Sequence, residues 1–163
     1  RKPKDTIYIP QNTVLFFTEE SIEKEVREIC EARGIGYKCI SDGLKLLDSL
    51  GYDLNQSPFN LSHGQMVKLA VALAQITRAK LILLDEPFSG LTYTDRARLL
   101  EHFKDVESSI IVAVSNLDAY SGSYWTQTYK LENGTLLEFK PNKTFSLTHA
   151  SWFYEALKNG VGN

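Results

Sequence analysis

Two adjacent carboxylates, Asp85 and Glu86, directly follow the apolar run Leu81–Leu84 and precede Pro87. A continuous apolar run of this length predicts a strand buried on both faces of a parallel sheet. Ligands of open α/β sheets bind outside the carboxyl ends of the strands. There an aspartate can hold Mg²⁺ through water ligands, and a glutamate can activate an attacking water. Taken alone, the dipeptide is also compatible with a turn that exposes two solvated acids.

A second segment that could carry chemistry is Ser62-His63-Gly64-Gln65, which precedes a long apolar stretch. The spacing of Ser62 and Gln65 is that of a capping box, which closes the start of a helix. The capping box does not explain the glycine at position 64, because glycine inside a helix costs about 1 kcal/mol relative to alanine. A glycine in the first turn lets a phosphate approach the free N–H groups at the positive end of the helix. With the carboxylate strand following it, a phosphate site is the favoured interpretation.

These segments, in this order, resemble the second half of the nucleotide-binding domain of ATP-binding-cassette (ABC) ATPases. Leu61–Gln65 (LSHGQ) is similar to the family signature LSGGQ, and Leu81–Pro87 (LILLDEP) is similar to the Walker B strand. Shorter segments resemble the Q-loop, the D-loop, the switch position and the closing strands: Tyr8–Gln11, Ser89–Thr92, Ser115-Asn116 and Asn133-Gly134. The resemblance extends from about Ile7 to Phe139.

The resemblance implies a division of labour between two nucleotide-binding domains paired head to tail, with each ATP between the phosphate loop of one and the signature of the other. Carried over, Glu86 is the base that orients water, and Asp85 supports Mg²⁺. Gln11 would contact Mg²⁺ or the water, and Asn116 would stand at the switch position. The residues implied to bind the ATP of the opposite subunit are Ser62, His63, Gly64 and Gln65.

The chain also departs from the family pattern. No G-x-x-x-x-G-K-[ST] phosphate loop occurs in its 163 residues. His63 replaces a glycine, Thr92 replaces the usual aspartate, and Asn116 replaces a histidine, so it cannot carry a positive charge near neutral pH. Asn116 could instead cap a helix. The three replacements predict a site that hydrolyses ATP slowly and pairs with a more standard subunit.

The sequence pattern predicts an α/β fold of the P-loop NTPase-like ABC type, in partial form. Apolar spacing indicates amphipathic helices at 19–32, 41–50 and 94–106, a buried helix at 62–77, and a second buried strand at 110–114. Asn133-Gly134 predicts a hairpin within 128–139, and a last helix is expected at 148–158. We therefore expect one incomplete domain (1–163), an inserted helical subdomain (18–77) and a C-terminal tail with a helix (140–163).

Composition places the chain among ordinary globular proteins, with 43% hydrophobic and 23% charged residues. A net charge of −2 gives no sign of a nucleic-acid partner. No apolar stretch is long enough to span a bilayer. Cys30 and Cys39 are predicted to be free thiols in a reducing compartment, although residues nine positions apart could also meet in space. The start at Arg1 suggests a fragment or a processed product.

The resulting expectation is an ATP-binding subunit of an ABC transporter, which couples ATP binding and hydrolysis to transport. ATP and Mg²⁺ are the expected cofactors. The expected partners are a second nucleotide-binding subunit and a transmembrane subunit, at the cytoplasmic face of the cell membrane. Two segments further resemble ATPases of energy-coupling-factor importers, Ser57–Phe59 and Phe16–Val26. The alternatives are a translation-type or DNA-repair-type ABC ATPase, or a non-catalytic interaction module. Without its phosphate loop, the chain itself is expected to be inactive.

Overall fold

The computed structural model describes residues 5–115 and 124–138 of the chain. These residues belong to two compact units, which divide between Ser115 and Asn116. Asn116, the expected helix at 148–158 and the expected tail at 140–163 lie outside the described residues. The division into one domain with a helical subdomain at 18–77 stays a prediction.

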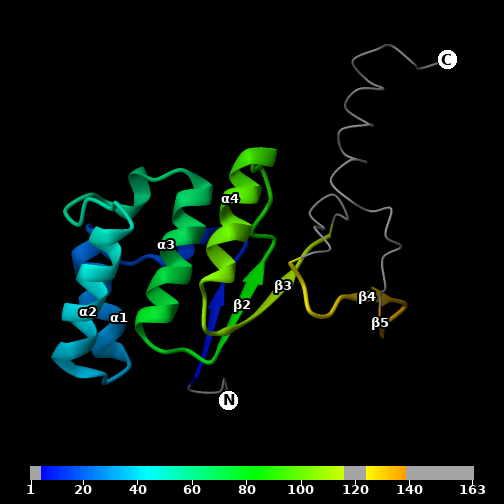
Figure 1. Ribbon diagram of the computed structural model, residues 1–163, viewed down its shortest axis with the longest axis horizontal. Helices are drawn as coiled ribbons and strands as arrows, with labels where there is room; N and C mark the ends of the chain where they lie inside the picture. The colour runs from blue at the N-terminus through cyan, green and yellow to red at the C-terminus, as the bar shows by residue number, and fades with distance from the viewer. Residues whose placement is uncertain (1–4, 116–123, 139–163) are drawn as a thin grey trace, which may run out of the picture. The chain divides into compact units, whose positions relative to one another are not determined.

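Three parallel strands form the sheet of the first unit, in the order β1 (Thr6–Ile9), β2 (Leu81–Asp85), β3 (Ser109–Ala113) (Figure 1). Ile7 pairs with Ile82, and Ile82 pairs with Ile110. Helices lie between successive strands, as right-handed βαβ crossovers require for a parallel sheet. The α/β class predicted from the sequence is therefore confirmed.

One face of the sheet is buried and the other is not. Alternate side chains of a strand point to opposite faces, and Ile9, Ile82 and Leu84 are at most 2% exposed beneath α3 and α4 (Figure 1). On the opposite face Leu83 is half-buried, and Ile111 is 57% exposed. The prediction that 81–84 is buried on both faces is therefore wrong, and so is the prediction of a buried strand at 110–114. Among the described strands, β3 pairs only with β2 and forms an edge.

Two helices begin at serine caps, whereas a third begins earlier than predicted. Ser21 caps α1 (Ile22–Ala32), and Ser62 caps α3 (His63–Ile76). The predicted helix at 41–50 starts earlier, as α2 (Gly36–Ser49), and a glycine with φ +82° at position 51 follows its end. Short 3₁₀ turns occupy Thr13–Phe16 (η1) and Pro58–Asn60 (η2). Eight of the fourteen residues of α3 are buried, which confirms its prediction as a buried helix.

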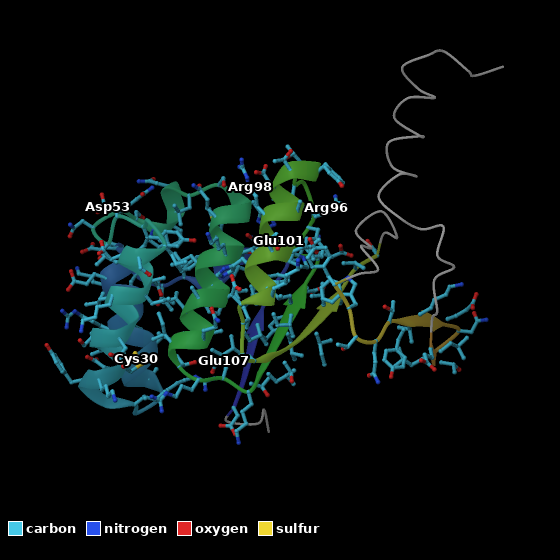
Figure 2. All side chains as sticks on the ribbon, in the orientation of Figure 1. Cys30, Asp53, Arg96, Arg98, Glu101 and Glu107 are labelled. Atoms are coloured by element: carbon cyan, nitrogen blue, oxygen red, sulfur yellow. A yellow bond between two sulfur atoms is a disulfide. The ribbon has the colours of Figure 1, made fainter. Side chains whose placement is uncertain are left out.

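Helix α2 packs closely on α1 and α3 through Gly43. A Cβ atom built on Gly43 would lie 2.9 Å from side-chain carbons of both Val26 and Ile76. Helix α4 (Tyr93–Lys104) packs beside α3 on the sheet and buries Leu99 and Leu100. Its outward face carries charged side chains that include Arg98 and Glu101 (Figure 2). No helix within the described ranges is long and apolar enough to cross a membrane.

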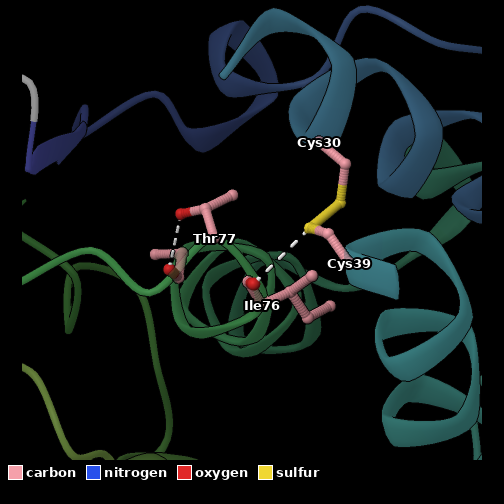
Figure 3. The surroundings of a disulfide bond; sticks show 5 residues. Cys30, Cys39, Ile76 and Thr77 are labelled. Atoms are coloured by element: carbon pink, nitrogen blue, oxygen red, sulfur yellow. Dashed lines mark hydrogen bonds between the residues drawn. A yellow bond between two sulfur atoms is a disulfide. The ribbon is translucent and has the colours of Figure 1, made fainter. Parts of the chain in front are cut away.

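A disulfide joins Cys30 of α1 to Cys39 of α2 (Figure 3). The prediction of two free thiols is therefore wrong. The chain reverses direction between the two helices at Gly34, which has φ +69°, and this brings the two Cα atoms to 6.0 Å. Both cysteines are buried, and Cys39 Sγ lies 3.6 Å from the carbonyl oxygen of Ile76 on α3. The bridge therefore joins α1 to α2 covalently and lies against the end of α3.

The second unit contains the antiparallel hairpin of β4 (Tyr129–Glu132) and β5 (Thr135–Glu138). Asn133 and Gly134 form its two-residue turn, with φ of +47° and +76°. Both angles are the left-handed values that a type I′ turn requires, and asparagine and glycine accept them at low cost. The predicted hairpin is confirmed.

Candidate functional site

The carboxyl end of β2 delivers Asp85 and Glu86, and the strands on its two sides hold them. The Tyr8 hydroxyl on β1 donates to Asp85 Oδ2 at 2.9 Å. The backbone N–H of Ser115, just after β3, donates to the Glu86 carboxylate. Both acidic side chains are half-buried. Each carboxylate is thus held by a donor from a different neighbour of β2: Asp85 by β1, and Glu86 by the residue that follows β3.

Glu86 leaves the strand in a strained conformation. Its φ of +46° lies in the left-handed region, which costs a residue with a side chain roughly 1 kcal/mol or more. The Glu86 N–H donates to the Ala113 carbonyl at 2.9 Å, and its own carbonyl accepts from Ser89 N–H at 3.1 Å. These bonds maintain the turn. Residues held in this region are concentrated at functional sites, which agrees with a catalytic location.

The donor set at this edge fits a magnesium ion that is shared with phosphate groups. Mg²⁺ usually takes one or two carboxylates, keeps several waters and obtains other ligands from a bound nucleotide. Asp85 supplies one half-buried carboxylate at the sheet edge. Within residues 5–115 and 124–138, no three His, Cys, Asp or Glu side chains form a cluster that could hold a metal by themselves. A Mg²⁺ ion bound through Asp85 would therefore need further ligands from water or from a bound nucleotide.

The start of α3 is closed by the predicted capping box. Gln65 N–H donates to Ser62 Oγ at 3.4 Å, and Ser62 N–H donates to Gln65 Oε1 at 2.9 Å. Close packing also favours glycine at position 64, in addition to the predicted approach of a phosphate. A Cβ atom there would lie 3.2 Å from a methyl carbon of Leu91. A leucine of the D-loop-like segment therefore rests against the first turn of the signature-like helix.

His63 and Gln11 meet in a small cleft. A space of about 380 Å³ is lined by Gln11, Asn12, His63 and Ser89. His63 Nε2 is shielded from solvent and has no hydrogen-bond partner among the described residues. Burial lowers the pKa of His63, which favours a neutral imidazole at neutral pH. Asp85 and Glu86 are not among the residues that line this cleft, which brings Gln11 together with His63 of the signature-like segment.

Thr92 has a structural role of its own. Its Oγ1 accepts from the Asp95 N–H at 3.2 Å and donates to Asp95 Oδ2 at 2.7 Å, so Thr92 caps α4. The replacement of aspartate by threonine therefore preserves a helix cap, because both residue types are good N-caps. Sequence reasoning placed Tyr8, Leu91 and Ser115 within the Q-loop-like, D-loop-like and switch-like segments but predicted none of their contacts. Their contacts depend on strand register and loop packing, which the local sequence does not report.

Comparison with known proteins agrees with this geometry. The family model described as ABC transporter matches residues 2–89, more than half of the chain. An energy-coupling factor transporter ATP-binding protein, EcfA2 of Streptococcus pneumoniae, is 33% identical over 87% of this chain and 46% of its own length. A putative ABC transporter ATP-binding protein of Sulfurisphaera tokodaii is 28% identical over 82% of this chain and 28% of its own length. The chain therefore spans less than half the length of these relatives.

Solved structures show the same fold. The protein cbiO1 of Clostridium perfringens, described as part of an ABC transporter complex, superposes with a TM-score of 0.72 at 18% identity. That match covers 96% of this chain and 64% of the other. An ATP-binding subunit of an ABC transporter gives a TM-score of 0.62 at 22% identity, over 93% and 63% of the two chains. From the family match and the shared fold, we conclude that this chain belongs to the ABC transporter family.

Proposed function

We propose that the chain is part of the ATP-binding subunit of an ABC transporter, and that it supplies the carboxylates of one ATP site and the signature of another. One observation carries the proposal: Asp85 and Glu86 end a parallel strand, with the capped signature-like helix α3 packed over the same sheet. No specific contact favours a translation-type or DNA-repair-type ATPase.

In this mechanism Glu86 would accept a proton from the water that attacks the γ-phosphate, and Asp85 would hold Mg²⁺ through water ligands. The ion, when bound, would neutralise charge that develops on the phosphate oxygens. The N–H groups at the start of α3 would face the phosphate of an ATP held mainly by the second subunit. The Ser115 N–H donates to the Glu86 carboxylate and so orients it.

A chimera tests the catalytic role directly. The part of the EcfA2 relative that precedes its matched region would be fused in front of this chain, and ATP turnover would be measured. We expect hydrolysis by the chimera and a loss of at least about 10²-fold in Glu86→Gln, because general-base catalysis contributes that much or more. Glu101→Gln, on the exposed face of α4, is the matched control. Equal turnover in the two variants would contradict the proposal.

The chain without a phosphate loop should bind ATP poorly. It lacks the glycine-rich loop and the lysine that hold the β- and γ-phosphates. Isothermal titration calorimetry with Mg²⁺ and ATP should therefore give no tight binding. Tight, Mg²⁺-dependent binding by this polypeptide would show that another segment has replaced the loop.

We further propose a membrane-embedded partner, contacted through η1. Val14 and Leu15 of η1 are 42% and 73% exposed and follow Gln11 within one turn. An apolar surface beside the Q-loop-like residue is suited to a helix of a transmembrane subunit, which would place the chain at the cytoplasmic face of the membrane. The relatives' names, as transporter ATP-binding proteins, support this. Leu15→Asp should abolish co-purification of the chimera with EcfA2's own membrane partner, whereas Tyr37→Asp on α2 should not.

Slow turnover and asymmetric pairing remain part of the proposal. His63 adds a neutral ring beside the expected phosphate site, and Asn116 would be unable to carry a positive charge there. In the chimera, Asn116→His should raise turnover. Vigorous hydrolysis before this change, or no gain after it, would count against a weakened site.

A further inference from the structure

The contact between Tyr8 and Asp85 is set by strand register. Tyr8 pairs with Leu83, so its side chain lies on the same sheet face as those of Leu83 and Asp85. Asp85 is two residues further along β2, which makes it a diagonal neighbour of Tyr8. The tyrosine ring spans that diagonal, and its hydroxyl meets Asp85 Oδ2 at 2.9 Å. Because an ionised carboxylate can only accept, the tyrosine is the donor.

This hydrogen bond restricts a side chain that little else orients. The terminal torsion of an aspartate is broad, so its two oxygens exchange position easily unless a donor fixes one of them. On the other side of Asp85 the paired residue is Ala113, which offers no polar side chain. In the part of the chain that the structure describes, no lysine or arginine forms an ion pair with Asp85. The Tyr8 hydroxyl is therefore the side-chain donor that selects the orientation of this carboxylate.

We propose that Tyr8 is a positioning residue for Asp85: its hydroxyl holds Oδ2 and leaves Oδ1 directed to a divalent cation and its water ligands. This inference rests on the proposed role of Asp85 towards Mg²⁺. Hydrogen bonds that orient a metal-binding carboxylate commonly change metal affinity by about 10- to 100-fold when they are removed. Tyr8 acts through Asp85 and touches no reacting atom itself.

Paramagnetic broadening by Mn²⁺ measures this effect without ATP turnover, on the chimera described above with ADP present, because the ion would share its ligands with a nucleotide. The ¹⁵N-labelled protein would be titrated with Mn²⁺, and the loss of the backbone amide signals of Asp85 and Glu86 would be followed. Three variants would be compared, Tyr8→Phe, Asp85→Asn and Tyr129→Phe. Tyr129 is a matched control because it is 49% exposed, against 43% for Tyr8, and its hydroxyl donates to Gln127 in the hairpin.

We expect Tyr8→Phe to need at least about tenfold more Mn²⁺ for the same broadening, with the rest of its spectrum unchanged. Asp85→Asn should abolish the selective broadening, and Tyr129→Phe should match the unmodified chimera. Asp85-dependent broadening that Tyr8→Phe leaves unchanged or strengthens would overturn the positioning role alone. A lack of Asp85-dependent broadening in the unmodified chimera with ADP would overturn both this role and the proposed magnesium function of Asp85.

Discussion

Single residues at the site divide into those that local sequence identifies and those that only the fold reveals. Ser62 and Gln65 lie three positions apart, and their mutual hydrogen bonds were predictable from that spacing. Tyr8 and Asp85 are 77 positions apart, and their contact depends on strand register. A sequence pattern therefore located both carboxylates, but it could not name the donors that orient them.

Glu25 illustrates a residue whose importance sequence periodicity concealed. An acidic residue of an amphipathic helix is expected on its solvent face, yet Glu25 is only 4% exposed. Its carboxylate accepts the backbone N–H groups of Thr18 and Glu19, each at 2.6 Å. These bonds tie the loop after η1 to α1. We expect Glu25→Ala to lower the free energy of unfolding by about 1–3 kcal/mol, because it leaves two donors without a protein partner. Urea denaturation with Glu28→Ala, an exposed change on the same helix, as control would measure this.

The same residue predicts a pH effect. Burial raises the pKa of the Glu25 carboxyl above its ordinary value of 4.5, and the two N–H donors oppose this shift less strongly. A carboxyl group whose pKa is higher in the folded state than in the unfolded state stabilises the fold most at pH values below its unfolded-state pKa. This contribution is lost as the pH rises through the folded-state pKa. The Glu25→Gln variant has no titrating group at this position, so it does not lose stability in this way as the pH rises. Its stability relative to the unmodified chain should therefore increase from pH 4 to pH 7 in urea titrations. A relative stability that falls with pH would show that the hydrogen bonds outweigh burial.

Elements were predictable where their ends carry local signals, and less so where burial depends on distant neighbours. The caps at Ser21 and Ser62 and the Asn133-Gly134 turn place their elements within a few residues. The apolar run in β3 suggested a buried strand, but burial requires elements on both faces, which the run itself does not specify. Likewise, the cysteine spacing could not show that α1 and α2 turn back on each other.

Gly43 permits the close approach of α2 to α1 and α3. Alanine favours a helix over glycine by about 1 kcal/mol, so propensity alone predicts that Gly43→Ala is stabilising. The new Cβ, however, would lie 2.9 Å from carbons of both Val26 and Ile76. Overpacking of this kind typically costs about 1–3 kcal/mol. We therefore expect net destabilisation, seen as a lower urea midpoint, whereas Lys45→Ala on the exposed face of α2 should leave the midpoint nearly unchanged.

The disulfide between α1 and α2 should contribute measurably to stability. It closes a short loop with a sequence separation of nine. A loop of that size restricts the unfolded chain enough to stabilise the fold by about 2–3 kcal/mol. Addition of dithiothreitol should lower the unfolding free energy by this amount. The double variant Cys30→Ser/Cys39→Ser should lose sensitivity to the reductant. Free thiols found by mass spectrometry in the air-oxidised chain would contradict the bridge.

At the scale of the whole molecule, one face of the parallel sheet is left partly exposed. Parallel sheets are normally covered on both faces. Here Tyr8, Leu83 and Ile111 form a row across the three strands at one register, on the face opposite α3 and α4. Tyr8 is 43% and Ile111 is 57% exposed. The edge of β3 beside this row pairs with no other described strand. An apolar face next to a free strand edge favours association with another polypeptide.

We therefore expect the isolated chain to self-associate as its concentration rises. Ile111→Lys should shift it towards the monomer, because a charge at the β3 end of the row is costly to bury at a contact between copies. Sedimentation velocity over a range of concentrations would measure the change. Tyr37→Lys is a demanding control, since Tyr37 on α2 is 81% exposed, more than Ile111 is. If exposure alone caused association, Tyr37→Lys would be at least as effective as Ile111→Lys; if the open sheet face causes it, only Ile111→Lys will act. An unmodified chain that remains monomeric at every concentration would contradict this prediction.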